Sequence, residues 1–373
     1  MSRIIKQHLI MPFQCTCFRA IPRRVTLPAW RTQSHARILL HTRTGGHMNG
    51  KSLADYFDDI SGLADLQLMG EPKPYLERSS PAPAKKDLLV YIGCNALRTI
   101  HLVKELSAIL RAMAFDFNVA GGPAHCCGMV CRRDDPDRAR SWGIKSLEHF
   151  ARYGARHLVV FCPSCSKHYE ELASLGATFP FTHESVPCFL ARHVEQLDVT
   201  HRVDRRIAIH SHSGTDQARS DDCSIRKLLR AVPGVVLLDA DGAAASGWAC
   251  TRSQIDTIGA TEWRNGNSVA LRSAVAAGAD TFVTPYYSCQ REICQEEANY
   301  PIRIVHYLSV LCEAIGVAHR DQYKCYKLSA SRESMLADLQ KAATDAGLDA
   351  ESIRRAYLRC FVTHTTPGGR NPS

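Results

Sequence analysis

Short apolar runs alternate with amphipathic stretches between residues 87 and 317. Asp87–Gly93 (DLLVYIG) is a continuous apolar run, which is typical of a strand buried in a parallel sheet. From Leu97 to Met113 the apolar positions recur every three or four residues, so this segment predicts an amphipathic helix. A strand followed by a helix is the repeating unit of parallel α/β folds.

The same alternation continues through the next fifty residues. Strands are predicted at Phe115–Ala120 and His157–Phe161. Between them, Asp135-Pro136 supplies an N-cap and a first-turn proline for a helix that Gly154 is placed to end. Three strands joined by helices predict a right-handed, mostly parallel sheet.

The second half of the chain repeats this pattern. Gly154-Ala155 returns as Gly278-Ala279 at an offset of 124 residues, and the same offset places Cys165 on Cys289. We therefore predict an α/β fold of two tandem pseudo-symmetric domains, each a small, mostly parallel sheet flanked by helices. The predicted elements of the second copy are strands at Arg206–Ser211, Val235–Asp239 and Thr281–Thr284, and helical segments at Ile225–Ala231 and Leu271–Ala277.

A linker rich in Pro, Ser and Ala, Glu71–Lys86, separates a short predicted helix near Ser52–Leu63 from the body of the chain. With 373 residues, two or three domains are expected. The predicted organisation is a leader and linker over 1–86, a first domain over 87–203, a second domain over 204–318 and a C-terminal extension over 319–373.

The formal net charge of +9 comes from the leader. Residues 1–54 contain nine of the 46 Lys and Arg and no acid, which leaves 37 bases against 37 acids in the rest. A neutral body gives no reason to expect nucleic-acid binding. The leader resembles an organelle transit peptide, or it is translated upstream sequence before a true start at Met48. Its prolines favour the second interpretation, and residues 1–47 are expected to lie outside the fold.

Compartment and membrane contact follow from composition. No segment reaches the ~18 apolar residues of a spanning helix, so no direct membrane span is expected. Sixteen cysteines at irregular spacings, in a chain too long to need disulfide stapling, favour metal binding or catalysis in a reducing compartment. We predict a cytoplasmic protein, with an organelle matrix as the alternative if residues 1–47 are a transit peptide.

Five cysteines carry the strongest chemical signal: Cys94, Cys126, Cys127, Cys162 and Cys165, with Gly128 completing a C-C-G triplet. All five follow predicted strands, at the edge where such sheets bind ligands. Neighbouring side chains of extended chain point to opposite sides, so the adjacent pair suits a polynuclear cluster better than one small ion. An iron–sulfur site is the favoured interpretation. Four of the thiolates binding zinc, or five unligated thiols, are the alternatives.

The second copy has lost most of this motif. Spacing places Ser213 on Cys94, Ala249-Cys250 on the cysteine pair and Tyr286 on Cys162. One hypothesis is a mixed tetrahedral zinc site; the favoured one is a set of hydrogen-bonded side chains without metal. The candidate ligands are His210, His212, Cys250 and Cys289, and Cys223, Tyr287, Cys294 and His306 are expected to crowd the same site.

The five-cysteine motif resembles the cysteine-rich CCG domain. That domain occurs in duplicate in one of the subunits of heterodisulfide reductase, in iron–sulfur subunits of glycolate and lactate oxidases, and in an atypical succinate dehydrogenase subunit. The resemblance covers roughly Asp87–Val317, with a degenerate second copy. It implies one [4Fe-4S] cluster of the noncubane type, held by Cys94, Cys126, Cys127, Cys162 and Cys165. It implies no such cluster in the second copy, where Cys250 and Cys289 are the matched sulfurs.

The resemblance implies an iron–sulfur subunit of a heterodisulfide-reductase-like oxidoreductase complex, acting on a thiol or disulfide. The implied partners are a ferredoxin-like iron–sulfur subunit and a flavoprotein subunit, because no phosphate-binding glycine motif for flavin or nicotinamide occurs in this chain. The alternative is a non-catalytic assembly or scaffold subunit with structural zinc in the first site. A thioredoxin-like use of Cys162 and Cys165 leaves the other three cysteines unexplained.

Overall fold

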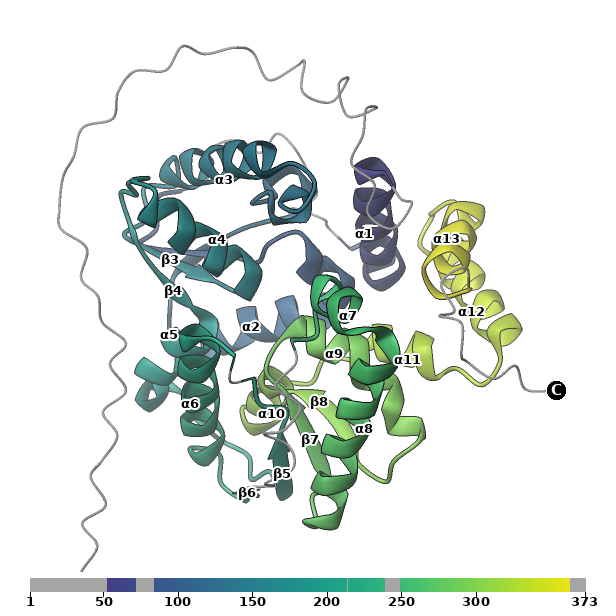
Figure 1. Ribbon diagram of the computed structural model, residues 1–373. Coiled ribbons are helices and arrows are strands. Elements are labelled where there is room, and N and C mark those ends of the chain that lie inside the picture. Colours follow the sequence, from purple (N-terminus) through teal and green to yellow (C-terminus); the bar gives the residue numbers. More distant parts are fainter. Residues whose placement is uncertain (1–51, 72–83, 213, 239–248, 363–373) are drawn as a thin grey trace, which may run out of the picture.

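The computed structural model describes residues 52–71, 84–212, 214–238 and 249–362, except for the side chains of residues 252, 253 and 362. Within them, two α/β halves lie against each other, and helices from both ends of the chain pack at one flank (Figure 1). The predicted fold class is confirmed: each half has a sheet of four parallel strands flanked by helices.

The first sheet has the strand order β2-β1-β3-β4, so its two earliest strands lie side by side and the later ones add beyond β1. Every residue of β1 is buried, as its apolar sequence predicts. A fourth strand, β4, joins the three predicted ones. The strands are β1 (Leu88–Tyr91), β2 (Phe117–Ala120), β3 (His157–Val160) and β4 (Thr182–Ser185).

The second sheet has the order β6-β5-β7-β8, which is the same topology displaced by four strands. It too gains a fourth strand, β8, beyond those predicted. The Asp239 end of the predicted strand 235–239 lies outside the described residues. The strands are β5 (Arg205–Ile209), β6 (Val235–Leu237), β7 (Thr281–Thr284) and β8 (Arg303–His306).

Helices connect the strands in both halves. Asp135 caps α3 as predicted, because its carboxylate accepts the N–H of Arg138 at 2.9 Å. A short 3-10 turn, η2 (Asn95–Thr99), precedes α2. The remaining helices are α2 (Ile100–Ala112), α3 (Pro136–Ala151), α4 (Pro163–Ser174), α5 (Val186–Arg192), α6 (Asp216–Arg230), α7 (Arg252–Ile258), α8 (Ala260–Ala276), α9 (Tyr287–Ile293) and α10 (Tyr307–Ala314).

The two halves match in detail as well as in strand order. Gly154 after α3 and Gly278 after α8 both adopt positive φ, +63° and +80°, just before β3 and β7. Glycine suits both turns because side chains disfavour this region. Beyond these strands, Cys162 and Tyr286 stand at equivalent N-cap positions of α4 and α9. The predicted offset of 124 residues therefore holds at this edge of the sheets.

One hydrophobic cluster extends across both halves. Leu106 of α2 and Leu311 of α10 belong to the same buried cluster, and helices α5 and α6 also pack across the boundary. Between them, the Ser185 hydroxyl of the first half donates to the Asp221 carboxylate of the second half. Continuous packing of this kind fixes the two sheet edges relative to each other.

Helix α1 (Leu53–Leu68) packs on the body although a linker separates it in sequence. Its Ile60 and Ala64 enter the main core, and its Leu63 and Leu66 meet the C-terminal extension. The predicted helix near Ser52–Leu63 therefore continues to Leu68. The extension consists of α11 (Gln322–Leu328), α12 (Arg332–Asp345), α13 (Ala350–Tyr357) and a short helical turn, η8 (Leu358–Val362). Residues 1–47, predicted to lie outside the fold, fall outside the described residues.

Candidate functional site

Five buried thiols meet at the carboxyl edge of the first sheet. Cys94 follows β1, Cys126 and Cys127 follow β2, and Cys162 and Cys165 follow β3, each at most 7% exposed. The Sγ atoms of Cys94 and Cys126 lie 3.7 Å apart, and those of Cys127 and Cys165 lie 3.1 Å apart. Side-chain hydrogen bonds join Cys126 to Cys127 and Cys165 to Cys162. The structure thus brings together the five cysteines predicted from sequence.

The adjacent pair reaches two sides of this cluster of thiols. Cys126 faces Cys94, whereas Cys127 faces Cys165. Gly128 permits the turn that follows, because its φ is +90° and a Cβ there would lie 2.5 Å from the carbonyl oxygen of Ala139 in α3. Gly128 in turn donates its N–H to Cys126 Sγ at 3.4 Å. The C-C-G triplet thus packs closely against α3, with each of its two sulfurs beside a different cysteine of the site.

Two of the five thiols have a lowered pKa. Hydrogen bonds from Cys126 and Cys165 lower the pKa of Cys127 to about 6. For Cys162, a hydrogen bond from Cys165 and the backbone N–H groups at the start of α4 lower the pKa to about 7, against the effect of burial. Burial raises the pKa of Cys165 well above its usual value. A cation bound among them would favour the thiolate form of all five.

Side chains from elsewhere in the chain complete the first site. The Tyr287 hydroxyl, from α9 of the second half, donates to Cys162 Sγ at 3.0 Å. Arg291 of the same helix donates to Asn95, beside Cys94, at 3.2 Å. A hydrogen bond with Cys126 and burial raise the pKa of the Cys94 thiol well above its usual value, and the positive charge of Arg98 acts in the opposite direction. Sequence reasoning placed Tyr287 at the second site; the contact across the halves corrects this.

A second group of donors lies at the equivalent edge of the second sheet. His210 and His212 follow β5, Cys250 comes from the loop before α7, and Cys289 lies in the first turn of α9. One donor atom from each lies within 4.8 Å of the other three, and all four residues are buried. These are the four ligands of the zinc hypothesis. Ser213, the predicted counterpart of Cys94, lies outside the described residues.

Of the other residues expected at the second site, one lies near it and two do not. His306 is fully buried and its electrostatic neighbours include Cys289, so it lies nearby. Cys223 is exposed on α6. Cys294 packs with α1 and the C-terminal helices, and its Sγ faces the Arg291 carbonyl at 3.9 Å. Both expectations for these two cysteines were wrong, because the helices that carry them turn the thiols away.

Three further cysteines pack against other parts of the chain and belong to neither group of donors. Cys131 is buried with Leu53 and Ala139 beside the C-C-G turn. Cys312 of α10 is buried with its Sγ 3.5 Å from the Glu105 carbonyl, and Cys360 lies half-buried near the C-terminal end of the described residues. None of the cysteines in the described ranges forms a disulfide.

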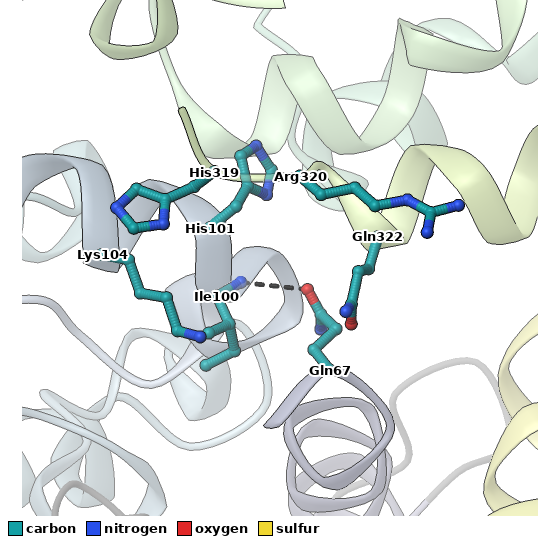
Figure 2. A pocket seen from close by; sticks show the side chains of 7 residues that line it. All are labelled: Gln67, Ile100, His101, Lys104, His319, Arg320 and Gln322. Atoms are coloured by element: carbon teal, nitrogen blue, oxygen red, sulfur yellow. Dashed lines mark hydrogen bonds between the residues drawn. The ribbon is translucent and has the colours of Figure 1, made fainter. Parts of the chain in front are cut away.

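A separate pocket lies where α1, α2 and the segment before α11 meet (Figure 2). Gln67 accepts the N–H of Ile100 at 3.0 Å there, which ties α1 to the start of α2. Two basic side chains of the lining have acidic neighbours, since Lys104 pairs with Glu71 and His101 lies 3.4 Å from Asp321. No cysteine lines this pocket, so it is not part of either thiol site.

The fold and the first site define a two-domain α/β protein with a cysteine-rich site at a sheet edge. The family model of the cysteine-rich domain called CCG matches residues 88–169, which contain all five cysteines of that site. The first half of this chain therefore contains a CCG cysteine-rich domain. A cysteine-rich domain and a Cys/His donor cluster together indicate metal binding.

Comparison with solved structures gives distant similarity. An aspartate racemase homologue from Pyrococcus horikoshii OT3 has 11% identity and a TM-score of 0.30, over 62% of this chain and 98% of its own. A putative Asp/Glu racemase from Yersinia pestis has 10% identity and a TM-score of 0.31, over 65% of this chain and 100% of its own. No curated protein sequence matches the chain.

Among the described residues, none of the helices is long and apolar enough to cross a membrane.

Proposed function

We propose that Cys94, Cys126, Cys127, Cys162 and Cys165 hold one [4Fe-4S]-type cluster, and that the protein transfers electrons to or from a thiol or disulfide. The observation that carries this proposal is the meeting of five buried thiols from three strand ends, with an adjacent pair that faces two different partners. A single zinc ion uses four ligands and leaves one of the five without a role. The match to the CCG domain supports the same assignment.

The surroundings of the thiols suit a negatively charged cluster. The start of α4 directs N–H groups at Cys162, and Gly128 directs another at Cys126. Tyr287 donates to Cys162, and Arg98 brings positive charge near Cys94. Each of these contacts stabilises thiolate relative to thiol, and hydrogen bonds to cluster sulfurs are one of the ways in which proteins set reduction potentials.

A bound cluster of this type would supply one-electron chemistry and an iron able to accept a thiolate. Reduction of a disulfide to two thiols consumes two electrons and two protons, so a protein with one such cluster needs partners. We propose a ferredoxin-like iron–sulfur subunit that delivers electrons and a flavoprotein subunit that pairs them, in a heterodisulfide-reductase-like complex of the cytoplasm. This chain's part is to hold the cluster in a buried site against the second half.

Anaerobically purified full-length protein tests the cluster. We expect about four iron and four acid-labile sulfide per chain and an EPR signal in one oxidation state. A small thiol added in excess should change that spectrum, because thiolate binding alters the iron. Cys126→Ser and Cys127→Ser, one at a time, should each abolish the iron–sulfur spectrum, since each cysteine reaches a different side of the site.

Cys131→Ser is the matched control, because Cys131 is a buried thiol of the same segment that packs on Leu53 and Ala139 instead. Its iron content should equal that of the wild type. A first site that binds stoichiometric zinc, and keeps it in either Cys126→Ser or Cys127→Ser, would leave a scaffold subunit in place of an electron carrier. That zinc measurement is made in a Cys250→Ser, Cys289→Ser background, so that the second group of donors cannot contribute.

A further inference from the structure

The donor cluster of the second half has the dimensions of a site for one metal ion. His210 Nε2 lies 3.2 Å from Cys250 Sγ, and His212 Nε2 lies 3.1 Å from Cys289 Sγ. All four donor atoms lie within 4.8 Å of one another. Zinc at ~2.0 Å from nitrogen and ~2.3 Å from sulfur sets its tetrahedral ligands about 3.3–3.8 Å apart. Side-chain shifts of up to about 1 Å would therefore complete the tetrahedron.

The four side chains come from three separate segments and share one buried position. His210 and Cys289 are fully buried, Cys250 is 1% exposed and His212 is 5% exposed. The two imidazole rings lie edge to face, with centroids 4.6 Å apart, and Phe282 and Tyr286 line the histidines. A thiolate buried in such surroundings costs stability unless its charge is compensated, and a divalent cation compensates two thiolates.

The pKa of one thiol in this group, that of Cys289, already favours the thiolate, which is the form that binds a metal. Burial raises the pKa of the Cys289 thiol, but Cys250, His212 and His210 together lower it well below its usual value. Burial lowers the pKa of His210, so this imidazole is neutral, as a metal ligand must be. The other two ligands shift the opposite way: Cys289 raises the pKa of His212 despite burial, and burial raises the pKa of Cys250 well above its usual value. The distances and burial of the four donors therefore remain the observation that points to a metal site.

We propose that His210, His212, Cys250 and Cys289 bind one Zn²⁺ in a closed tetrahedral site that joins the end of β5, the loop before α7 and the start of α9. Two nitrogen and two sulfur ligands in tetrahedral arrangement suit zinc. Four protein ligands leave no open position, so the role is structural. The equivalents of three first-site cysteines are Ser213, Ala249 and Tyr286, so the second site cannot accept the five-thiolate ligand set.

This site stands apart from the proposed iron–sulfur function, and metal analysis separates the two. Wild-type full-length protein, purified anaerobically without added metal, should contain one zinc per chain in addition to its iron. Cys250→Ser and His212→Ala should each lose that zinc and keep the iron. Cys294→Ser is the control, because Cys294 lies five residues after Cys289 with its thiol turned toward the Arg291 carbonyl.

A variant that exchanges one ligand type for another distinguishes loss of a ligand from misfolding. His212→Cys replaces one zinc ligand by another, so it should retain zinc where His212→Ala does not. With Co²⁺ in place of zinc, the wild type should show thiolate-to-cobalt charge transfer and the intense visible bands of tetrahedral cobalt, and His212→Cys should strengthen the charge transfer. Wild-type protein without zinc, zinc retained in Cys250→Ser, or iron in place of zinc at this site would each overturn the proposal.

Discussion

At the carboxyl edge of the first sheet, five thiols meet; at the same edge of the second sheet, two imidazoles and two thiols meet. The backbone that carries them is equivalent, with one strand order and matching helix starts at Cys162 and Tyr286. The comparison shows that two α/β halves of one topology both carry donor side chains at this edge, with different ligand sets. Five sulfurs suit a polynuclear cluster, whereas four compact donors suit one ion.

The sharpest test of this comparison uses a cysteine that both halves retain. Cys165 and Cys289 occupy equivalent positions in the first turns of α4 and α9. Cys165→Ser should lose all iron and keep zinc; Cys289→Ser should lose zinc and keep iron. The iron and zinc contents of both variants, measured side by side, test whether each variant loses one metal and keeps the other. Loss of both metals in either variant would mean that the two sites do not fill independently.

A second prediction concerns the boundary between the halves. Glu105 of α2 is buried there and accepts the Ser309 hydroxyl of α10 at 2.9 Å, and burial raises its pKa from 4.5 to about 8. Its stability contribution is therefore fully present below pH 4.5 and is lost as the pH rises through 8. Glu105→Gln should remove this loss and stabilise the protein at pH 8.5 by on the order of 3 kcal/mol.

Denaturant unfolding at several pH values checks that prediction. The wild-type free energy of unfolding should fall between pH 5 and pH 8.5, and the slope should be shallower in Glu105→Gln. Glu313→Gln is the control, because Glu313 is a half-exposed carboxylate of α10 paired with Arg205. Equal slopes in the wild type and Glu105→Gln would show that Glu105 keeps its ordinary pKa.

Local sequence patterns predicted the parts of the fold that depend on local forces. The buried run of β1, the N-cap at Asp135 and the glycine turns at 154 and 278 follow from burial periodicity and backbone preference. The strands β4 and β8 were not predicted, because four-residue edge strands such as Thr182–Ser185 carry little apolar signal. The packing of α1 across its linker depends on residues some 300 positions away.

The candidate site also combines features that local sequence predicts with a contact that depends on how the two halves pack. Strand ends and cysteine spacing were enough to bring five thiols together, because the carboxyl ends of parallel strands share an edge. The contact of Tyr287 with Cys162 spans 125 residues and depends on how two halves pack, which no local pattern encodes. A signal did exist: Tyr287 follows the residue that the offset places on Cys162.

The residue after the second cysteine of the pair gives a third, smaller comparison. Gly128 follows Cys127, whereas Thr251 follows Cys250 and caps α7 by accepting the N–H of Gln254 at 3.3 Å. Gly128→Ala places a Cβ 2.5 Å from a backbone oxygen at positive φ, so it should destabilise the protein by about 2–3 kcal/mol and lower iron loading. Thr251→Ala should cost about 1 kcal/mol and leave the iron unchanged.

Thermal unfolding and metal content of the two variants measure this difference. Gly122 offers a further contrast, since it also has a positive φ, +82°, close to the same cysteine pair. Gly122→Ala should destabilise the fold through its positive-φ backbone conformation. An unfolding free energy for Gly128→Ala equal to that of the wild type would show that α3 can move away from the C-C-G turn at no cost.

The smallest expected effect lies where the second half contacts the first site. Tyr287→Phe removes the hydroxyl that donates to Cys162 Sγ and keeps the ring that packs on Phe161. A hydrogen bond to a ligand sulfur stabilises the more negative, reduced state, so its loss should lower the reduction potential by tens of millivolts. Iron and zinc content should not change. Redox titration followed by EPR measures the shift, with Tyr286→Phe as the control, because the Tyr286 hydroxyl donates to Asp221 instead. Equal potentials in Tyr287→Phe and the wild type would show that α9 shields the first site without tuning it.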